Sequence, residues 1–482
     1  MARDGYVSAL SGRYASPEMQ FLFSDDRKFS GGKGWRGIWY ELARAQQAQG
    51  VDRITDAHLE EMAAHLDDPV DYGRVAVIEK ELRHDVMANI RAFGEVCPGA
   101  AGVFPIAATS CDTTDNVEQV IMRDGLILII KALARVIDRL TRFADEYKSL
   151  PTLGSTHYQA AALTTVGKRA CMWAQNFLMD LEHLEWFMRS MRLRGLKGAT
   201  GTQASFLELF EGDHTKVLAM EAHFAQALGF DRVFTITGQT YPRKVDSQVL
   251  GILSGIAQSV HKMALDIRLL AHDKEIEEPF GSKQVGSTAM PWKRNPMRVE
   301  RGCSLSRIPL AMELVAQVTE GVQFLERSLD DSAARRVSIA EAFLGVDAIL
   351  QIVQNVSEGL VVYPAVIRRR IDEELPFMAI ETILVEMVKV GADRQECHEQ
   401  LREHSQAAAA VVKNEGGSND LLERIRADER FAPVHDRLDD LLDPSQFIGR
   451  APQQVEAFLE NEVKPALKPY RDVLGGTAEL SV

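Results

Sequence analysis

Three apolar stretches advance in alternating steps of four and three residues, and this rhythm constrains the fold more than any other feature of the chain. They run over residues 126–147, 249–270 and 342–360. A mean spacing of about 3.5 residues keeps one apolar seam of a helix facing a partner helix. Each stretch of about 20 residues would form a helix roughly 30 Å long. The rhythm therefore predicts a bundle of long helices and a mainly α fold.

Neighbouring segments extend this prediction. Residues 167–194 and 299–324 are also compatible with long helices, and Pro309 should kink the second of them. Positions outside the seam, such as Ile129, are apolar as well, so a second face of each long helix is expected to be buried. Helices buried on two faces are compatible with a bundle that continues into neighbouring subunits. Strand signals are few, with residues 234–237 as a candidate.

Prolines and glycines mark the ends of the bundle region. Four of them interrupt the helical pattern near residue 100, and Pro364 ends the last long stretch. These breaks predict an N-terminal helical domain over residues 1–111, a central long-helix bundle domain over 112–364 and a C-terminal helical domain over 365–482.

Composition and charge exclude several classes of function. The net charge of −14 argues against a nucleic-acid or anionic-membrane partner. Residues 1–6 lack the apolar segment of a signal peptide, and the most apolar patch, residues 125–130, is too short to span a bilayer. The five cysteines are an odd number without metal-like spacing, so we expect reduced thiols and no disulfide framework. We therefore expect a cytoplasmic protein.

The segment 286–296 reads Gly-Ser-Thr-Ala-Met-Pro-Trp-Lys-Arg-Asn-Pro and lies between two long helical patterns. Its glycines and prolines, with those that flank it, cannot continue a helix. A loop that carries Ser287 and Lys293 between rigid helices can act as a lid that brings a hydroxyl and a cation to a substrate. Composition alone is equally compatible with an ordinary solvated loop, so both interpretations stay open at this point.

Other polar candidates stand at breaks between helices. Thr109 and Ser110 open the first long helix, where free backbone N–H groups favour a carboxylate or phosphate. A lone histidine more often has a structural role, but His84 and His157 stand beside hydroxyls and cations at helix ends or loops, which leaves both roles open. The glycine-rich turn over residues 197–203 lacks the spacing of a phosphate-binding P-loop.

The loop resembles the signature of the fumarase/aspartase superfamily, Gly-Ser-Ser-x-Met-Pro-x-Lys-x-Asn-Pro, with Thr288 in place of the second Ser. Further segments, in order from residue 11 past residue 450, resemble the animal-type branch of the adenylosuccinate lyase family. These segments include Arg13-Tyr14, Arg83-His84-Asp85, Thr109-Ser110-Cys111, Thr156-His157, residues 197–206, Gln239, residues 295–301, Ser332 to Arg336, and Asn419-Asp420.

The resemblance implies a three-domain fumarase/aspartase-type fold with a central long-helix bundle shared across a homotetramer, each site being built from three chains. It implies β-elimination of fumarate from adenylosuccinate, giving AMP, and from SAICAR, giving AICAR, in purine biosynthesis. It also implies a small-molecule succinyl-nucleotide substrate, no metal and no organic cofactor, and neither nucleic acid nor membrane as a partner.

The resemblance also implies roles for individual residues. Ser287 would be the general base and His157 the general acid, while Lys293 would stabilise the Ser287 alkoxide inside a closed lid that excludes water, and His84 would support the phosphate or carboxylate side of the substrate. The substrate-binding residues would be Arg13, Tyr14, Arg83, Asp85, Thr109, Ser110, Gln239, Asn295, Arg301, Arg327, Ser332 and Arg336. If their arginines are gathered in one cleft, they would make the local potential positive for an anionic substrate, despite the negative net charge of the chain.

Three segments depart from the family's usual residues. Pro105-Ile106-Ala107 replaces a common His-Leu-Gly, and Ala160 and Ala334 stand where Pro and Asn are frequent. These departures keep open a related lyase acting on a modified succinylamino nucleotide. A non-enzymatic homologue is a third possibility, which the retention of Ser287, His157 and Lys293 disfavours.

Overall fold

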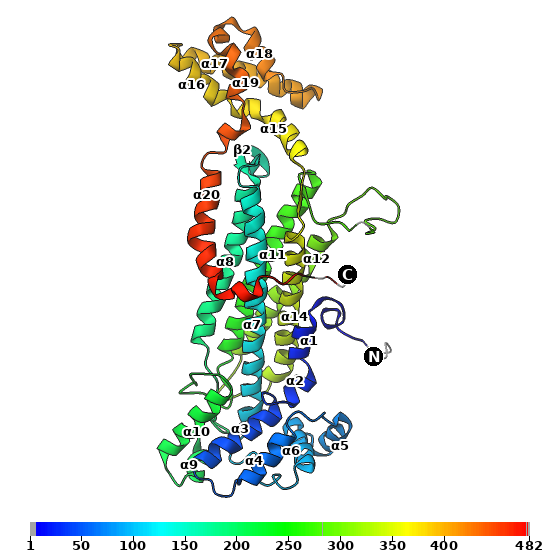
Figure 1. The fold of residues 1–482 in the computed structure, drawn as a ribbon, viewed down its shortest axis with the longest axis vertical. Helices are drawn as coiled ribbons and strands as arrows, with labels where there is room; N and C mark the ends of the chain where they lie inside the picture. The colour runs from blue at the N-terminus through cyan, green and yellow to red at the C-terminus, as the bar shows by residue number, and fades with distance from the viewer. Residues whose placement is uncertain (1–5, 282, 479, 481–482) are drawn as a thin grey trace.

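A rod of helices runs through the centre of the molecule (Figure 1). The structure is a computed structural model that describes residues 6–281, 283–478 and 480. The rod is built from α7 (Ser110–Glu146), α8 (Val166–Ser190), α11 (Lys244–His272), α12 (Met297–Leu305), α13 (Arg307–Gly321) and α14 (Asp331–Ser357). The three rhythmic stretches lie in α7, α11 and α14, so the prediction of a mainly α fold with long central helices is confirmed.

The seams of these helices form the main core. Leu133 of α7, Ile256 of α11 and Ile349 of α14 are all fully buried. Ile129, which lies outside the seam of α7, is fully buried too, as the second apolar face predicts. The long helices therefore gain most of their stability from packing against one another rather than from helix propensity.

The predicted kink at Pro309 is a full break. The segment over residues 299–324 forms two helices, α12 and α13, which meet at Ser306. Proline has no N–H to donate, and its ring clashes with the carbonyl four residues earlier, here that of Leu305. The helix therefore ends before the proline and starts again with Pro309 in its first turn.

The N-terminal region begins beside the middle of the rod, next to α14, and continues to one end of the rod (Figure 1). It contains the π-helical turn η1 (Leu10–Tyr14) and the helices α1 (Pro17–Leu22), α2 (Asp25–Phe29), α3 (Trp35–Ala48), α4 (Asp56–Ala64), α5 (Tyr72–Leu82) and α6 (Asp85–Val96). Trp39 packs against Phe93 and Phe104, with ring centroids 6.0 Å away in each case. Its Nε1 donates to Thr113 Oγ1 at 3.0 Å. This aromatic cluster fixes the N-terminal helices on the first turn of α7.

The strands lie elsewhere than predicted. Residues 234–237 form no strand, and nearby only an isolated bridge joins Leu193 to Val233 among the described residues. Instead, β1 (Pro151–Thr156) and β2 (Gln159–Thr165) form an antiparallel hairpin, and β3 (Ile276–Glu277) pairs with β4 (Val361–Val362). The hairpin was not predicted because its two-residue turn is His-Tyr rather than the usual Asn-Gly or Asp-Gly.

The C-terminal helices divide into two sets. The outer set consists of α15 (Pro364–Met378), α16 (Ile380–Lys389), α17 (Arg394–Ala410), α18 (Leu421–Ala427) and α19 (Leu438–Leu441), with short π- and 3-10-helical turns between them. Helices α16 to α19 share a core of their own, which includes Ile383, Leu401 and Phe431. The buried apolar residues of α15 belong instead to the main core. The returning set, α20 (Ala451–Phe458) and α21 (Lys464–Leu467), packs back on the main core. The predicted domain boundaries at 111 and 364 stay predictions.

Among the described residues, one helix is long and apolar enough to cross a membrane. By length and composition α14 could cross a bilayer, with a mean hydropathy of 1.5 in its most apolar window. Within the protein, 78% of that window is buried. Burial of this kind is typical of the core helix of a bundle.

Candidate functional site

Within one chain the predicted site residues fall into separate groups. The hairpin that carries His157 lies near the end of the rod next to the outer C-terminal helices, whereas α5 and α6, which flank His84, lie at the other end (Figure 1). The signature loop, residues 283–296 of the predicted segment 282–296, extends from the side of the rod between β3 and α12. Residue 282 lies outside the described residues. A single chain therefore does not gather the predicted arginines and Lys293 in one cleft, and their meeting in a site built from several chains stays a prediction.

The largest group, here named the helix-end cluster, lies where α6, α7 and α14 begin. Its members are Arg83, His84, Asp85, Thr109, Ser110, Gln239, Arg327, Ser332 and Arg336. His84 caps α6, since its Nδ1 accepts a hydrogen bond from the Met87 N–H at 3.4 Å. The other ring nitrogen, Nε2, lies 3.4 Å from Ser110 Oγ. These contacts place the imidazole beside the free N–H groups at the start of α7.

Asp85 is the acidic member of the cluster. Arg336 Nη2 donates to its Oδ2 at 3.0 Å. Burial alone would raise the pKa of Asp85, but the hydrogen bonds from Arg336 and the Val86 N–H, with the charges of Arg336 and Lys28, outweigh burial and lower that pKa. Asp85 is therefore a carboxylate at neutral pH, and Arg336 is partly neutralised by it.

Arg327 is held from three sides. Its Nη1 donates to Gln239 Oε1 at 3.0 Å and lies 3.1 Å from Cys111 Sγ. Its Nη2 lies 3.4 Å from Asp331 Oδ1. Burial raises the pKa of the Cys111 thiol to about 12, so Cys111 contacts the guanidinium as a neutral thiol. The contacts fix the fork of Arg327 in one direction, as the binding of a phosphate or carboxylate requires.

A buried ion-pair network, here named the support network, holds this end of the rod together. Arg243 bridges Asp115 at 3.1 Å and Asp331 at 2.7 Å, and Arg335 Nε donates to Asp246 at 2.6 Å. All five side chains are at least nine-tenths buried. The sequence alone predicts no role for these five residues. Charged residues that stand within apolar helical stretches indicate buried ion pairs, because a buried charge must be paired.

The glycine-rich turn over residues 197–203 also has a structural role. The N–H groups of Lys197 and Gly198 donate to Asp112 Oδ1 at 2.8 and 3.2 Å. The other carboxylate oxygen of Asp112 accepts from the Thr109 N–H at 2.8 Å. The turn thereby fixes the first residues of α7, including the candidate Ser110.

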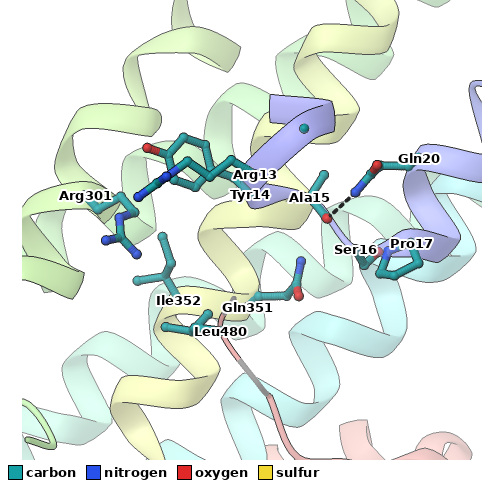
Figure 2. A pocket seen from close by; sticks show the side chains of 11 residues that line it. Arg13, Tyr14, Ala15, Ser16, Pro17, Gln20, Arg301, Gln351, Ile352 and Leu480 are labelled. Carbon is teal, nitrogen blue, oxygen red and sulfur yellow. Dashed lines mark hydrogen bonds between the residues drawn. The ribbon is translucent and has the colours of Figure 1, made fainter. Parts of the chain in front are cut away.

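A second group lines a cavity of about 410 Å³ on the side of the rod. We name it the arginine cavity, and its lining includes Arg13, Tyr14, Arg301, Gln351, Ile352 and Leu480. The Arg13 and Arg301 guanidinium carbons lie 5.8 and 5.7 Å from the centre of the Tyr14 ring. Figure 2 shows both guanidinium groups on the same side of the cavity. Two cations on one aromatic residue suit an anionic group of a ligand.

The signature loop folds back on itself around Ser287. Ser287 Oγ accepts hydrogen bonds from the N–H groups of Ala289 and Met290 at 3.3 and 3.2 Å. Asn295 Nδ2 donates to the Gly286 carbonyl at 2.7 Å. A Cβ on Gly286 would lie 2.1 Å from the Lys293 carbonyl, so only glycine permits the two arms of the loop to approach. Two backbone donors on one hydroxyl favour its ionised form.

His157 occupies the turn of the β1–β2 hairpin. His157 and Tyr158 have φ angles of 52° and 57°, the left-handed conformation that a tight two-residue turn requires. The imidazole is exposed, and within the described part of the chain no side chain or backbone group bonds to it. The hairpin therefore exposes the His157 side chain at this end of the rod.

The departures from the family's usual residues are visible in the backbone. Ala107 has a φ of 62°, a conformation that glycine adopts freely and alanine does not. Ala160 lies in β2 opposite Ser155, next to the His157 turn. Ala334 lies in the first turn of α14, beside the helix-end cluster. Pro105 precedes the strained residue and leads into α7. The departures thus lie beside two of the separate groups of candidate residues, and Ser287, His157 and Lys293 are all retained.

The described residues, 6–281, 283–478 and 480, contain no group of three or more His, Cys, Asp or Glu side chains arranged for a metal ion. The five cysteines are free and buried.

Comparisons with known proteins agree with this architecture. Residues 21–307 match the family described as Lyase, and residues 376–458 match the family described as Adenylosuccinate lyase C-terminus. The chain is 52% identical over 474 residues to the adenylosuccinate lyase of Saccharomyces cerevisiae, which covers 98% of this chain and 97% of that protein. It is 48% identical over 479 residues to the adenylosuccinate lyase of Schistosoma mansoni, with 99% of each chain covered.

Solved structures share the fold at lower sequence identity. A fumarate lyase from Mesorhizobium sp. BNC1 superposes with a TM-score of 0.78 at 23% identity, over 93% of this chain and 99% of that one. A 3-carboxy-cis,cis-muconate lactonizing enzyme from Pseudomonas putida gives 0.79 at 22% identity, over 96% and 99%. At this identity the two structures support the fold alone.

Proposed function

The chain belongs to the adenylosuccinate lyase family of the fumarase/aspartase superfamily, and from this premise we propose how its residues carry out the reaction. The activity is that of a fumarate-releasing C–N lyase. Its substrate is adenylosuccinate, which it divides into AMP and fumarate, and by our proposal SAICAR is divided in the same way into AICAR and fumarate. In this elimination a base removes a proton from a succinyl carbon, the C–N bond breaks, and an acid protonates the departing nitrogen.

The observation that carries the proposal is the surrounding of Ser287. A serine hydroxyl is a weak base in water, because its alkoxide forms only at very high pH. Here two backbone N–H groups already point at Oγ, and Lys293 follows in the same loop. With water excluded, these groups would stabilise the alkoxide and make proton abstraction feasible. We therefore assign the role of general base to Ser287.

His157 takes the role of general acid in this proposal. An exposed imidazole at the tip of a hairpin can reach the leaving nitrogen of a substrate that is bound elsewhere. Arg327, Arg336, Ser332 and His84 of the helix-end cluster, with Arg13 and Arg301 of the arginine cavity, supply the cations and donors for the phosphate and carboxylates. The remaining residues of the proposed substrate set are Tyr14, Arg83, Asp85, Thr109, Ser110, Gln239 and Asn295.

A complete site requires more than one copy of the chain, because the hairpin and the helix-end cluster lie at opposite ends of one rod. The surface of α8 supports such an assembly. Met172, Met179 and Trp186 are spaced seven residues apart and are each more than half exposed. A stripe of this kind is typical of a helix that packs against another subunit. We propose a homotetramer with a shared central bundle, a division into domains at about residues 111 and 364, and a cytoplasmic location.

The direct test is release of fumarate by the purified protein from adenylosuccinate and from SAICAR. We expect efficient turnover of both, and failure with adenylosuccinate would refute the proposed activity.

Mixing two inactive variants tests the shared site. His157→Gln and Ser287→Ala should each lose most turnover. When the two are dissociated and reassembled together, some sites would receive a natural His157 from one chain and a natural Ser287 from another. We expect a measurable fraction of activity to return. No recovery in mixed assemblies of natural mass would mean that both residues act within one chain.

A further inference from the structure

A stretch of chain beyond the last helix runs back along the rod to the arginine cavity. Arg139 of α7 and Gln354 of α14 both donate to the carbonyl of Gly476 at 2.9 Å. Asn355 Nδ2 donates to the carbonyl of Ala478 at 2.8 Å. Three side-chain donors therefore fix the path of two peptide carbonyls in a segment that has no regular secondary structure.

This path ends in the wall of the cavity. Leu480 lines the cavity with Ile352 and Gln351, and Figure 2 shows it facing the same space as Arg301. Leu480 also packs against the main core. An apolar side chain beside two guanidinium groups keeps water away from one side of an anion bound there, and a lower local dielectric strengthens the ion contact.

We propose that Leu480 is a determinant of substrate affinity, and that the hydrogen bond from Asn355 to the Ala478 carbonyl positions it. The inference rests on the proposed function, which places an anionic group of the substrate at Arg13 and Arg301. In this proposal the Leu480 side chain makes the same contact with the substrate in the ground state and in the transition state. Its loss therefore weakens binding of the ground state and the transition state equally, which raises KM and leaves kcat unchanged.

Two variants separate this role from a general loss of structure. Leu480→Ala removes the wall and should raise KM for adenylosuccinate roughly three- to tenfold, with kcat within about twofold of the natural value. Asn355→Asp replaces the donor with an acceptor, while Arg298 Nη1, which donates to Asn355 Oδ1 at 2.8 Å, keeps its partner. It should raise KM in the same direction. Asn461→Asp makes the same change on the exposed surface of another segment and should alter nothing.

Hydrogen exchange gives a readout that does not need turnover. We expect AMP with fumarate to slow exchange in a peptide that covers residues 474–478 in the natural protein, and to do so less in Asn355→Asp. The inference is overturned if KM is unchanged in both Leu480→Ala and Asn355→Asp. It is also overturned if AMP with fumarate does not change the rate of hydrogen exchange in this segment. If the natural protein releases no fumarate, the proposed activity fails, and the exchange experiment still decides whether this segment senses a nucleotide.

Discussion

In the helix-end cluster Arg327 and Arg336 are tied to carboxylates at helix starts, whereas in the signature loop Ser287 and Asn295 are tied to the backbone of the loop itself. Arg327 contacts Gln239, Cys111 and Asp331, and behind it the support network buries five charged side chains. Ser287 Oγ accepts hydrogen bonds from the N–H groups of Ala289 and Met290, and Lys293 is exposed.

The two regions differ because binding and proton transfer make different demands. A site that recognises phosphate or carboxylate gains from donors whose positions are fixed before the ligand arrives. A general base must be shielded from water during proton transfer but accessible when the substrate binds. A mobile loop meets both demands, because it can cover the base after the substrate has bound. The comparison predicts that changes in the loop affect catalysis at little cost in stability, and that changes in the support network do the reverse.

The largest effect is expected at the loop. Ser287→Ala should lower kcat roughly 10²- to 10⁴-fold, because the proton acceptor is gone, while KM and the unfolding temperature stay near their natural values. Steady-state fumarate release and thermal unfolding measure the two. Thr288→Ala removes the neighbouring hydroxyl and serves as the control. A kcat within tenfold of natural for Ser287→Ala would remove that residue from the role of base.

The next effect is expected in the support network. Asp115→Asn leaves Arg243 with one carboxylate instead of two in a fully buried place, and should cost on the order of 3–5 kcal/mol in the free energy of unfolding. Urea unfolding measures this cost. Asp145→Asn on the same helix breaks an exposed pair with Lys148 and should cost at most about 1 kcal/mol. Equal effects of the two variants would contradict the support role.

A smaller effect with a pH signature is expected at Asp180, a half-buried acid outside both regions. Burial raises its pKa to about 6, although a hydrogen bond from Ser259 acts in the opposite direction. The folded state therefore holds this proton more tightly than the unfolded state, so the natural protein loses stability as pH rises from about 4 to 6. Asp180→Asn should remove that loss and stabilise the protein by about 1–2 kcal/mol above pH 7.

Thermal unfolding at pH 4 and pH 7.5 checks this prediction. The gain of Asp180→Asn should be present at pH 7.5 and nearly absent at pH 4. Glu182→Gln makes the same charge change on an exposed residue nearby and should show no such pH dependence. A gain of equal size at both pH values would exclude titration of Asp180 as its cause.

The smallest effect is expected at the strained approach to the helix-end cluster. Ala107→Gly should stabilise the protein by about 1 kcal/mol, because glycine adopts the observed φ of 62° without strain. Ala108→Gly, one residue later, has no such strain to relieve and should destabilise by roughly 0.5–1 kcal/mol. Opposite shifts in unfolding temperature are the expected result, and shifts of the same sign would contradict the assignment of strain.

Much of the rod could be predicted from the sequence because the spacing of apolar residues directly records which face of a helix is buried. The 3.5-residue rhythm located α7, α11 and α14, and Pro309 located the break between α12 and α13 within a few residues. The β1–β2 hairpin could not be predicted, since its turn conformation is imposed on His157 and Tyr158 by the pairing of distant backbone groups. Turn chemistry of this kind leaves no local signature.

The site divides in the same way. Ser287, Lys293 and Asn295 could be named because a family motif holds them in consecutive order. The support network could not, because pairing of Asp115 with Arg243 or of Asp246 with Arg335 depends on the packing of helices far apart in sequence. The spread of the candidate residues over both ends of one rod was likewise invisible, although the resemblance implied sites built from several chains.

Helices α16 to α19 have a core separate from that of the rod, and the chain reaches them through α15 and leaves them before α20. Entry and exit thus bracket a self-contained cooperative unit inserted into a continuous scaffold. Such a unit can open by breaking only its own apolar contacts, while the scaffold keeps its full resistance to unfolding. Motion at that end of the protein is therefore decoupled from the stability of the rod that carries the anion-binding residues.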